Sequence, residues 1–128
     1  MTLKIGFVGL GRMGLRMVAR ILKTHEVVAY DINPKAVAEA GKLGAEQANS
    51  LEELAGALPI PRVVWIMVPA GAPVESVIDS LEPTLEDGDT LIDGGNSHYK
   101  DSVRRAERLQ AKGVSYLDVG TSGGAGGG

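Results

Sequence analysis

The glycines near the N-terminus have the spacing of a phosphate-binding turn. They lie in the segment Gly9-Leu10-Gly11-Arg12-Met13-Gly14, which follows the apolar run Ile5–Val8 and opens a stretch of helical character. The first glycine permits a tight turn out of a strand, the second lets the backbone approach a pyrophosphate, and the third lets helix and strand pack closely. The helix terminus offers unpaired N–H groups and a partial positive charge to phosphates. The pattern therefore predicts a dinucleotide site at Gly9–Gly14.

Asp31 lies where such a site needs an acidic residue. It closes a second apolar run about 20 residues after the first glycine. Its carboxylate can accept hydrogen bonds from both hydroxyls of an adenosine ribose. The alternative is a glycine-rich turn without a ligand, in which Asp31 only starts the turn Asp31-Ile32-Asn33-Pro34.

Arg12 adds a small independent argument. A cation in the first turn of a helix opposes the helix dipole unless an anionic ligand binds at that end. Arg12 also continues a basic outer face with Arg16, Arg20 and Lys23. Both interpretations of this residue stay open.

Three further segments of small or polar residues each follow an apolar run. They are Val68–Gly71, Asp93–Ser97 and Gly120–Gly124. Ligands of parallel sheets bind beyond the carboxyl ends of the strands, so we expect these segments to converge beside the glycine motif. Asn96 and Ser122 offer compact donors and acceptors, which suits a polar, hydroxyl-rich or anionic substrate. Three tight turns without a ligand are the alternative.

Apolar runs and helical stripes alternate along the chain, as is typical of a parallel sheet covered on both faces. We expect strands over 4–8, 27–30, 45–48, 62–68, 90–93 and 115–119, and helices over 12–23, 34–43, 50–58, 73–81 and 100–112. This rhythm predicts an α/β fold of the Rossmann type. Its doubly wound parallel sheet has about six strands in the order 3-2-1-4-5-6, with right-handed crossovers.

Capping residues and apolar stripes define the helices further. Asn33 with Pro34, and Ser50 with Glu53, have the spacing of helix starts, whereas Gly44 and Gly113 fit helix ends. Trp65 is expected in the core rather than against a ligand. The stripes expected to be buried are Met13, Met17 and Ile21; Ala36, Val37, Ala40 and Leu43; Val74, Val77, Ile78 and Leu81; and Val103, Ala106 and Leu109. Asp101 and Arg105 have the i, i+4 spacing of a helical ion pair.

Composition excludes several classes of function. The 128 residues, 44% of them apolar, suffice for one domain with a core. The absence of cysteine excludes disulfides, thiolate metal sites and a cysteine nucleophile. The net charge of −3 argues against a nucleic-acid partner, and His25 and His98 lack metal-ligand spacing. No apolar run approaches the roughly 20 residues of a membrane span, and no signal peptide precedes the first strand, which fits a cytoplasmic protein.

The glycine-rich end differs from the rest of the chain. Residues 121–128 cannot bury apolar surface, and glycine loses much entropy on ordering. We therefore expect a nucleotide-binding domain over residues 1–120, followed by a loop and a truncated or artificial tail.

Four stretches together resemble the 6-phosphogluconate dehydrogenases, in particular their short-chain, NAD-preferring branch. They are Gly9–Gly14, Val68–Gly71, Asp93-Gly94-Gly95-Asn96-Ser97-His98-Tyr99 and Thr121–Gly124. The Asp-Gly-Gly-Asn-Ser sequence discriminates, because the related 3-hydroxyacid dehydrogenases usually carry an Asp-x-Ser-Thr type sequence there. The resemblance implies oxidative decarboxylation of 6-phosphogluconate to ribulose 5-phosphate.

The resemblance also implies roles for individual residues. Val68, Pro69 and Ala70 would lie along the cofactor toward its nicotinamide half, although many longer members carry lysine at the position of Pro69. Asn96 would touch both the nicotinamide ribose and the substrate, and Ser122, Gly123 and Gly124 would bind the sugar acid. The catalytic lysine and glutamate of the family lie in a later helical domain, so we expect no catalytic residue and essentially no turnover within these 128 residues.

Asp31 also bears on the choice of cofactor. Its carboxylate would repel the 2′-phosphate of NADP, and NADP binders of the family commonly place Asn-Arg-Thr near the positions of Asp31, Ile32 and Asn33. Lys35 offsets part of that repulsion. We therefore expect NAD to be favoured over NADP.

Other functions remain open at the level of the sequence. A cofactor domain of a related 3-hydroxyacid dehydrogenase, a non-catalytic NAD-sensing module and a nucleotide-independent scaffold all share the fold. Dimers of the resembled family rely largely on the later helical domain, so we expect a monomer or weak dimer, without a nucleic-acid or membrane partner.

Overall fold

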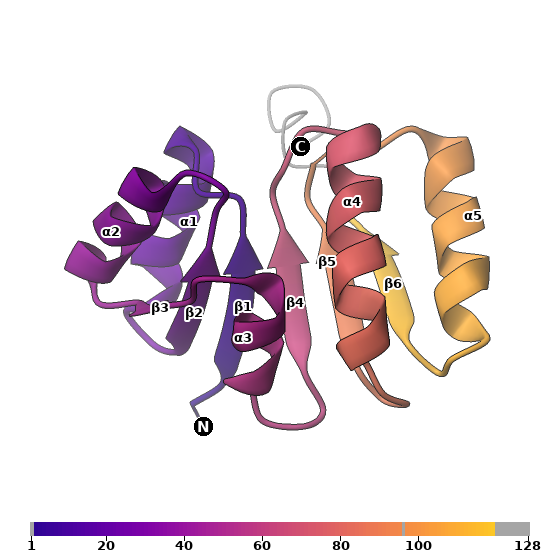
Figure 1. Cartoon of the computed structure of the whole chain (residues 1–128), viewed down its shortest axis with the longest axis horizontal. Coiled ribbons are helices and arrows are strands. Elements are labelled where there is room, and N and C mark those ends of the chain that lie inside the picture. The colour runs from indigo at the N-terminus through magenta and orange to yellow at the C-terminus, as the bar shows by residue number, and fades with distance from the viewer. Residues whose placement is uncertain (1, 96, 120–128) are drawn as a thin grey trace.

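The computed structural model describes residues 2–95 and 97–119 and contains a six-stranded parallel sheet. Its strands are β1 (Lys4–Val8), β2 (Glu26–Tyr30), β3 (Glu46–Gln47), β4 (Val63–Ile66), β5 (Thr90–Asp93) and β6 (Ser115–Asp118). The spatial order is β3-β2-β1-β4-β5-β6, with every neighbouring pair parallel. Both the Rossmann-type fold and the strand order predicted from the sequence are confirmed (Figure 1).

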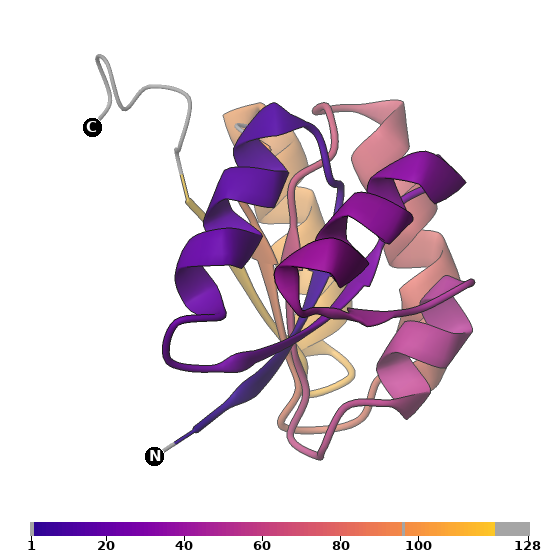
Figure 2. The ribbon, with the colours of Figure 1, turned by 90° about the vertical axis from the view of Figure 1, so that its left-hand side faces the viewer.

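Five helices cover the two faces of this sheet. They are α1 (Arg12–Ile21), α2 (Pro34–Leu43), α3 (Leu51–Gly56), α4 (Ala72–Leu81) and α5 (Tyr99–Gln110), with a 3-10 turn at Glu82–Thr84. One buried cluster packs α1 and α2 against β1 and β2, and the other packs α3, α4 and α5 against the opposite face. Figure 2 shows α1 on one side of the strands and α3 and α4 on the other. Among the helices described here, none combines the length and apolar character needed to cross a membrane.

The predicted helix caps form as expected. The Asn33 side chain accepts the Lys35 N–H at 3.0 Å, with Pro34 in the first helical position. The Ser50 hydroxyl accepts the Glu53 N–H at 3.0 Å, while the Glu53 carboxylate reaches back to the N–H of Asn49. Gly44 ends α2 with a φ of 115°, a left-handed conformation that glycine adopts without strain.

Three residues predicted to be buried are exposed instead. Met13 (48% exposed) lies in the first turn of α1, above the sheet, and Val18 and Gly14 take the buried face of this helix. Leu43 (45%) lies in the last turn of α2, over the edge strand β3, which has only two residues and offers little to pack against. Val103 (41%) faces outward because α5 turns a different face to the sheet.

The buried face of α5 carries polar residues. Ser102, Arg105 and Leu109 are 8%, 1% and 0% exposed. The expected pairing of Arg105 with Asp101 is wrong: Asp101 bonds Arg104, and Arg105 turns inward to partners on other elements. The stripe of α4, by contrast, is buried as predicted.

Candidate functional site

A large cavity lies at the carboxyl edge of the sheet. Its volume is about 930 Å³, and the ends of β1, β2, β4 and β5 together with helices α3 and α4 form its walls. In Figure 1 this edge is at the top, where the strand arrows point. The lining residues are Val8, Gly9, Leu10, Gly11, Met13, Tyr30, Asp31, Ile32, Leu51, Met67, Val68, Pro69, Pro73, Ser76, Val77, Ser80, Gly94 and Gly95.

Two of the three motif glycines are required by close packing inside the protein. Gly9 has a φ of 100°, and a Cβ there would lie 2.7 Å from the backbone carbonyl of Met67 at the end of β4. A Cβ on Gly14 would overlap the carbonyl oxygen of Gly9, so the helix could not approach the turn. These contacts bring α1 and the end of β4 against the same tight turn.

Gly11 differs, because nothing in the described protein needs it to lack a side chain. Its φ of −70° suits any residue, and a Cβ there would meet no atom within 4 Å. Gly11 is also the N-cap of α1, with no side-chain cap and no acidic residue in the first turn. A glycine that faces open space at an uncapped helix terminus fits a diphosphate that approaches the backbone closely.

Asp31 is tied to the glycine turn by its side chain. Its Oδ2 accepts the N–H of Leu10 at 2.6 Å, and its Oδ1 accepts the N–H of Asn33 at 2.8 Å. Two backbone donors therefore fix the carboxylate at the rim of the cavity. Each oxygen keeps a second lone pair, so the carboxylate retains the capacity to accept ribose hydroxyls.

The loops after β4 and β5 form the far wall of the cavity. The N–H of Gly94 donates to the carbonyl of Ile66 at 2.8 Å, which continues the sheet past β5. A Cβ on Gly94 would lie 2.5 Å from the sulfur of Met67, and one on Gly95 would overlap the carbonyl oxygen of Val68. The glycines of this loop thus allow it to lie directly against the end of β4.

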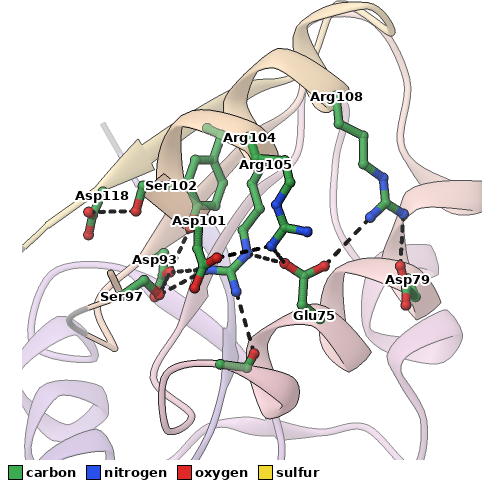
Figure 3. Close-up of polar contacts among 12 residues, drawn as sticks. Glu75, Asp79, Asp93, Ser97, Asp101, Ser102, Arg104, Arg105, Arg108 and Asp118 are labelled. Carbon is green, nitrogen blue, oxygen red and sulfur yellow. Dashed lines mark hydrogen bonds and ion pairs between the residues drawn. The ribbon is translucent and has the colours of Figure 1, made fainter. Parts of the chain in front are cut away.

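A buried polar network supports this wall from behind (Figure 3). Asp93, with 0% exposure, accepts the N–H of Gly95 at 2.8 Å, the hydroxyl of Tyr116 at 2.6 Å and the hydroxyl of Ser97. Arg105 contacts the same carboxylate at 3.5 Å. Burial, with help from the bond to Asp93, raises the pKa of Tyr116 to about 12, so its hydroxyl is protonated and donates at neutral pH.

The cavity brings together most of the predicted cofactor residues. Gly9, Leu10, Gly11, Met13, Asp31, Ile32, Val68 and Pro69 all line it. Arg12, Gly14, Asn33 and Ala70 lie beside it without lining it, and Asn33 already uses its side chain as the cap of α2. Asn96, Ser122, Gly123 and Gly124 lie outside the described residues.

Several lining residues escaped the sequence interpretation. Pro73, Ser76, Val77 and Ser80 of α4 line the cavity and follow the i, i+3, i+4, i+7 spacing of one helix face. This spacing could have predicted a second face of α4 turned toward a ligand. The stripe of Val74, Val77, Ile78 and Leu81 on the same helix is entirely apolar, and it was the more evident pattern. Trp65 does not line the cavity; it is half-buried and packs against the cluster under α1 and α2, as expected of a core residue.

Comparison with known families agrees with this geometry. A family model described as the NAD binding domain of 6-phosphogluconate dehydrogenase matches residues 4–128. The chain belongs to this family. Nicotinamide dinucleotide binding is therefore the function of this domain, and the chain is the NAD-binding domain of an oxidoreductase related to 6-phosphogluconate and 3-hydroxyacid dehydrogenases.

Individual relatives of this dehydrogenase domain are considerably longer. The NAD(+)-dependent decarboxylating 6-phosphogluconate dehydrogenase of Haloferax volcanii is 48% identical over 126 residues, which are 98% of this chain and 41% of the relative. The structure of 3-hydroxyisobutyrate dehydrogenase from Mycobacterium tuberculosis has a TM-score of 0.84 and 26% identity, covering 99% of this chain and 44% of that one. The 6-phosphogluconate dehydrogenase of Plasmodium falciparum, described in complex with NADP+ and with 6-phosphogluconate, has a TM-score of 0.78 and 30% identity over 88% of this chain and 26% of its own.

Proposed function

We propose that the domain prefers NAD to NADP, and that Asp31 enforces this preference. The supporting observation is that backbone donors at 2.6 and 2.8 Å hold both of its carboxylate oxygens. A carboxylate so fixed cannot swing away from a 2′-phosphate on the adenosine ribose. Two like charges about 4 Å apart repel by about 4 kcal/mol at an effective dielectric constant of about 20. The name of the Haloferax relative, an NAD(+)-dependent enzyme, agrees with this assignment.

Calorimetric titration with both oxidised cofactors tests the preference. We expect NAD to bind at least tenfold more tightly than NADP, because the screened repulsion exceeds the 1.4 kcal/mol that a factor of ten requires. Equal or tighter binding of NADP contradicts the role given to Asp31.

The proposed reaction of the whole enzyme is oxidative decarboxylation of 6-phosphogluconate to ribulose 5-phosphate. The nicotinamide ring, when bound, supplies the hydride acceptor. In this proposal the segment Gly9–Gly14 holds the diphosphate, and Asp31 with Ile32 and Asn33 surrounds the adenosine ribose. Val68, Pro69 and Ala70 border the nicotinamide half. The names of the relatives and the Asp-Gly-Gly-Asn-Ser sequence support this reaction.

The substrate side of the site belongs to the same proposal. Asn96 would contact both nicotinamide ribose and substrate, while Ser122, Gly123 and Gly124 would bind the sugar acid. Gly94 and Gly95 support this orientation, because they line the cavity and directly precede Asn96 in the chain. Catalytic residues would come from the part of the relatives that this chain does not span.

A hydroxyacid such as 3-hydroxyisobutyrate is a second candidate substrate, because part of the solved 3-hydroxyisobutyrate dehydrogenase shares the fold of this domain. Titrating 6-phosphogluconate and 3-hydroxyisobutyrate into the NAD-loaded chain, with heat as the readout, separates the two. Binding of 6-phosphogluconate alone supports the proposed reaction. A response to 3-hydroxyisobutyrate alone reassigns the substrate, and a response to neither favours an NAD-sensing module. Light scattering at two concentrations checks the expected monomer or weak dimer.

A further inference from the structure

Arg105 is the largest fully buried side chain of the described protein, although it carries a charge. It extends from the middle of α5 toward the back of the cavity wall, and its exposure is 1% (Figure 3). Its guanidinium does not line the cavity. Arg105 is therefore a buried cation directly behind the wall of this cavity.

The guanidinium bonds in three directions to three different elements. Nε donates to the Glu75 carboxylate of α4 at 2.6 Å, and Nη2 donates to the carbonyl oxygen of Gly71 at 3.4 Å. Nη1 donates to the Ser97 hydroxyl at 3.0 Å and lies 3.5 Å from the Asp93 carboxylate. One side chain thus connects the turn before α4 with the loop after β5.

Stabilisation of the fold alone does not account for this arrangement. Apolar residues of similar volume commonly stabilise a helix on a sheet as well as a buried ion pair does, because burying charge carries a large desolvation cost. A guanidinium differs from them in its rigid fork of directional donors. Here that fork determines where two loops lie relative to one another.

Those two loops hold the far half of the cavity. A dinucleotide with its adenosine ribose at Asp31 and its diphosphate at Gly11 must extend toward the ends of β4 and β5, where Val68, Pro69, Gly94 and Gly95 line the cavity. The Asp93 carboxylate that faces Arg105 also accepts the N–H of Gly95 at 2.8 Å. Arg105 therefore contacts Asp93, and Asp93 in turn is hydrogen-bonded to the Gly95 backbone, which borders the proposed position of the nicotinamide half.

We infer that Arg105 is a positioning residue for the nicotinamide half of the cofactor site, acting through Asp93 and Ser97 on the loop after β5 and through Gly71 on the turn before α4. This inference rests on the proposed orientation of the dinucleotide. It assigns no contact with the cofactor to Arg105 itself. Its distinctive consequence is that loss of the fork weakens binding of the nicotinamide half and leaves the adenosine half intact.

The test compares NAD with ADP, a probe that contains only the adenosine and diphosphate part. Arg105→Lys retains the charge but carries all its donors on one nitrogen, so it cannot reach Glu75, Ser97 and Gly71 together as Nε, Nη1 and Nη2 do. We expect it to lower the NAD affinity roughly tenfold. The ADP affinity should stay within about twofold of wild type, because the partners of Arg105 lie on the far half of the cavity, away from Asp31 and Gly11. Arg104→Lys is the matched control, because Arg104 is adjacent, also pairs with Glu75 and is 62% exposed. It should leave both affinities unchanged.

Hydrogen exchange supplies a readout of position rather than affinity. The Gly95 amide should exchange faster in Arg105→Lys than in Arg104→Lys, because its acceptor Asp93 loses the guanidinium contacts that hold it and Ser97 in place. A general destabilisation would instead speed exchange throughout the core. If Arg105→Lys fails to fold, Ser97→Ala takes its place, since it removes only the hydroxyl between the guanidinium and Asp93; the ratio of NAD to ADP affinity should then fall as well.

Failure of the inference and failure of the proposed function give different results. A wild-type chain that binds neither NAD nor ADP overturns the proposed function and the inference with it. A wild-type chain that binds NAD, with the same NAD-to-ADP ratio in Arg105→Lys or, if that variant is unfolded, in Ser97→Ala, overturns the inference alone.

Discussion

Gly11→Ala should weaken nucleotide binding while leaving the stability of the fold nearly unchanged. The position has an ordinary φ of −70°, and a Cβ there meets no described atom within 4 Å. Alanine is a poorer N-cap than glycine by about 0.5–1 kcal/mol. Alanine also lowers the conformational entropy of the unfolded chain, which stabilises the folded state by about 0.4–1 kcal/mol. The net change in the free energy of unfolding should therefore stay within about 1 kcal/mol, or roughly 4 °C in melting temperature.

Binding should respond much more strongly to the same methyl group. The methyl group occupies space that the diphosphate needs for close approach to the helix terminus. We expect NAD affinity to fall at least tenfold, equivalent to about 1.4 kcal/mol. Chemical denaturation gives the stability, and calorimetry gives the affinity of the same preparation.

Gly14→Ala is the matched comparison in the same motif. Its Cβ would overlap the carbonyl oxygen of Gly9, so the helix or the turn must move. We expect a loss of about 1–3 kcal/mol in the free energy of unfolding, as for other overpacked sites. Unchanged NAD binding in a folded Gly11→Ala variant, or a stability loss as large as that of Gly14→Ala, would refute the assignment of Gly11 to the ligand.

Three other changes have defined outcomes. Asp31→Asn combined with Ile32→Arg should shift the NAD-to-NADP affinity ratio toward NADP, because it removes the fixed charge and adds a cation; an unchanged ratio in paired titrations argues against the role of Asp31. Tyr116 has a pKa of about 12, above its ordinary value of 10.0, so folding favours the neutral phenol. Its stabilisation is present below pH 10 and is lost as pH rises from 10 to 12. The difference in unfolding free energy between wild type and Tyr116→Phe should shrink over that interval, and a constant difference would contradict it. Arg62→Met removes the cation that contacts the buried Asp89 carboxylate at 3.1 Å and leaves that charge unpaired. It should lower the free energy of unfolding by about 3 kcal/mol, as measured by chemical denaturation. The ratio of NAD to ADP affinity should not change. A selective loss of NAD binding there would show that any buried ion pair affects the site.

Local patterns in the sequence predicted most of the architecture. Alternation of apolar runs with helical stripes is set by nearest neighbours along the chain, and it identified all six strands and their order. The turn at Gly9–Gly14 was predicted for the same reason, since it needs only a strand before it and a helix after it. Leu43 is exposed because the neighbouring edge strand β3 has only two residues and offers little surface for packing. No sequence pattern predicted that this strand is so short.

The orientation of α5 could not be predicted in this way. Its sequence contains an i, i+4 pair and an apolar triad, both of which favour a helix with Val103 inward and Arg105 outward. The structure turns Arg105 inward because its acceptors Glu75 and Gly71 lie 30 and 34 residues away in the chain. An isolated arginine is too costly to bury, and only the assembled sheet brings together the carboxylates that reverse this cost.

The sequence by itself thus determined the doubly wound fold, the glycine turn and the acidic residue beside it, because each depends on residues close together in the chain. Tertiary structure alone decided that Asp31 is clamped by Leu10 and Asn33, that the serines of α4 face the cavity, and that a buried arginine supports its far wall. Those contacts join distant segments, and their energies depend on burial and on partners that exist only after the sheet has formed.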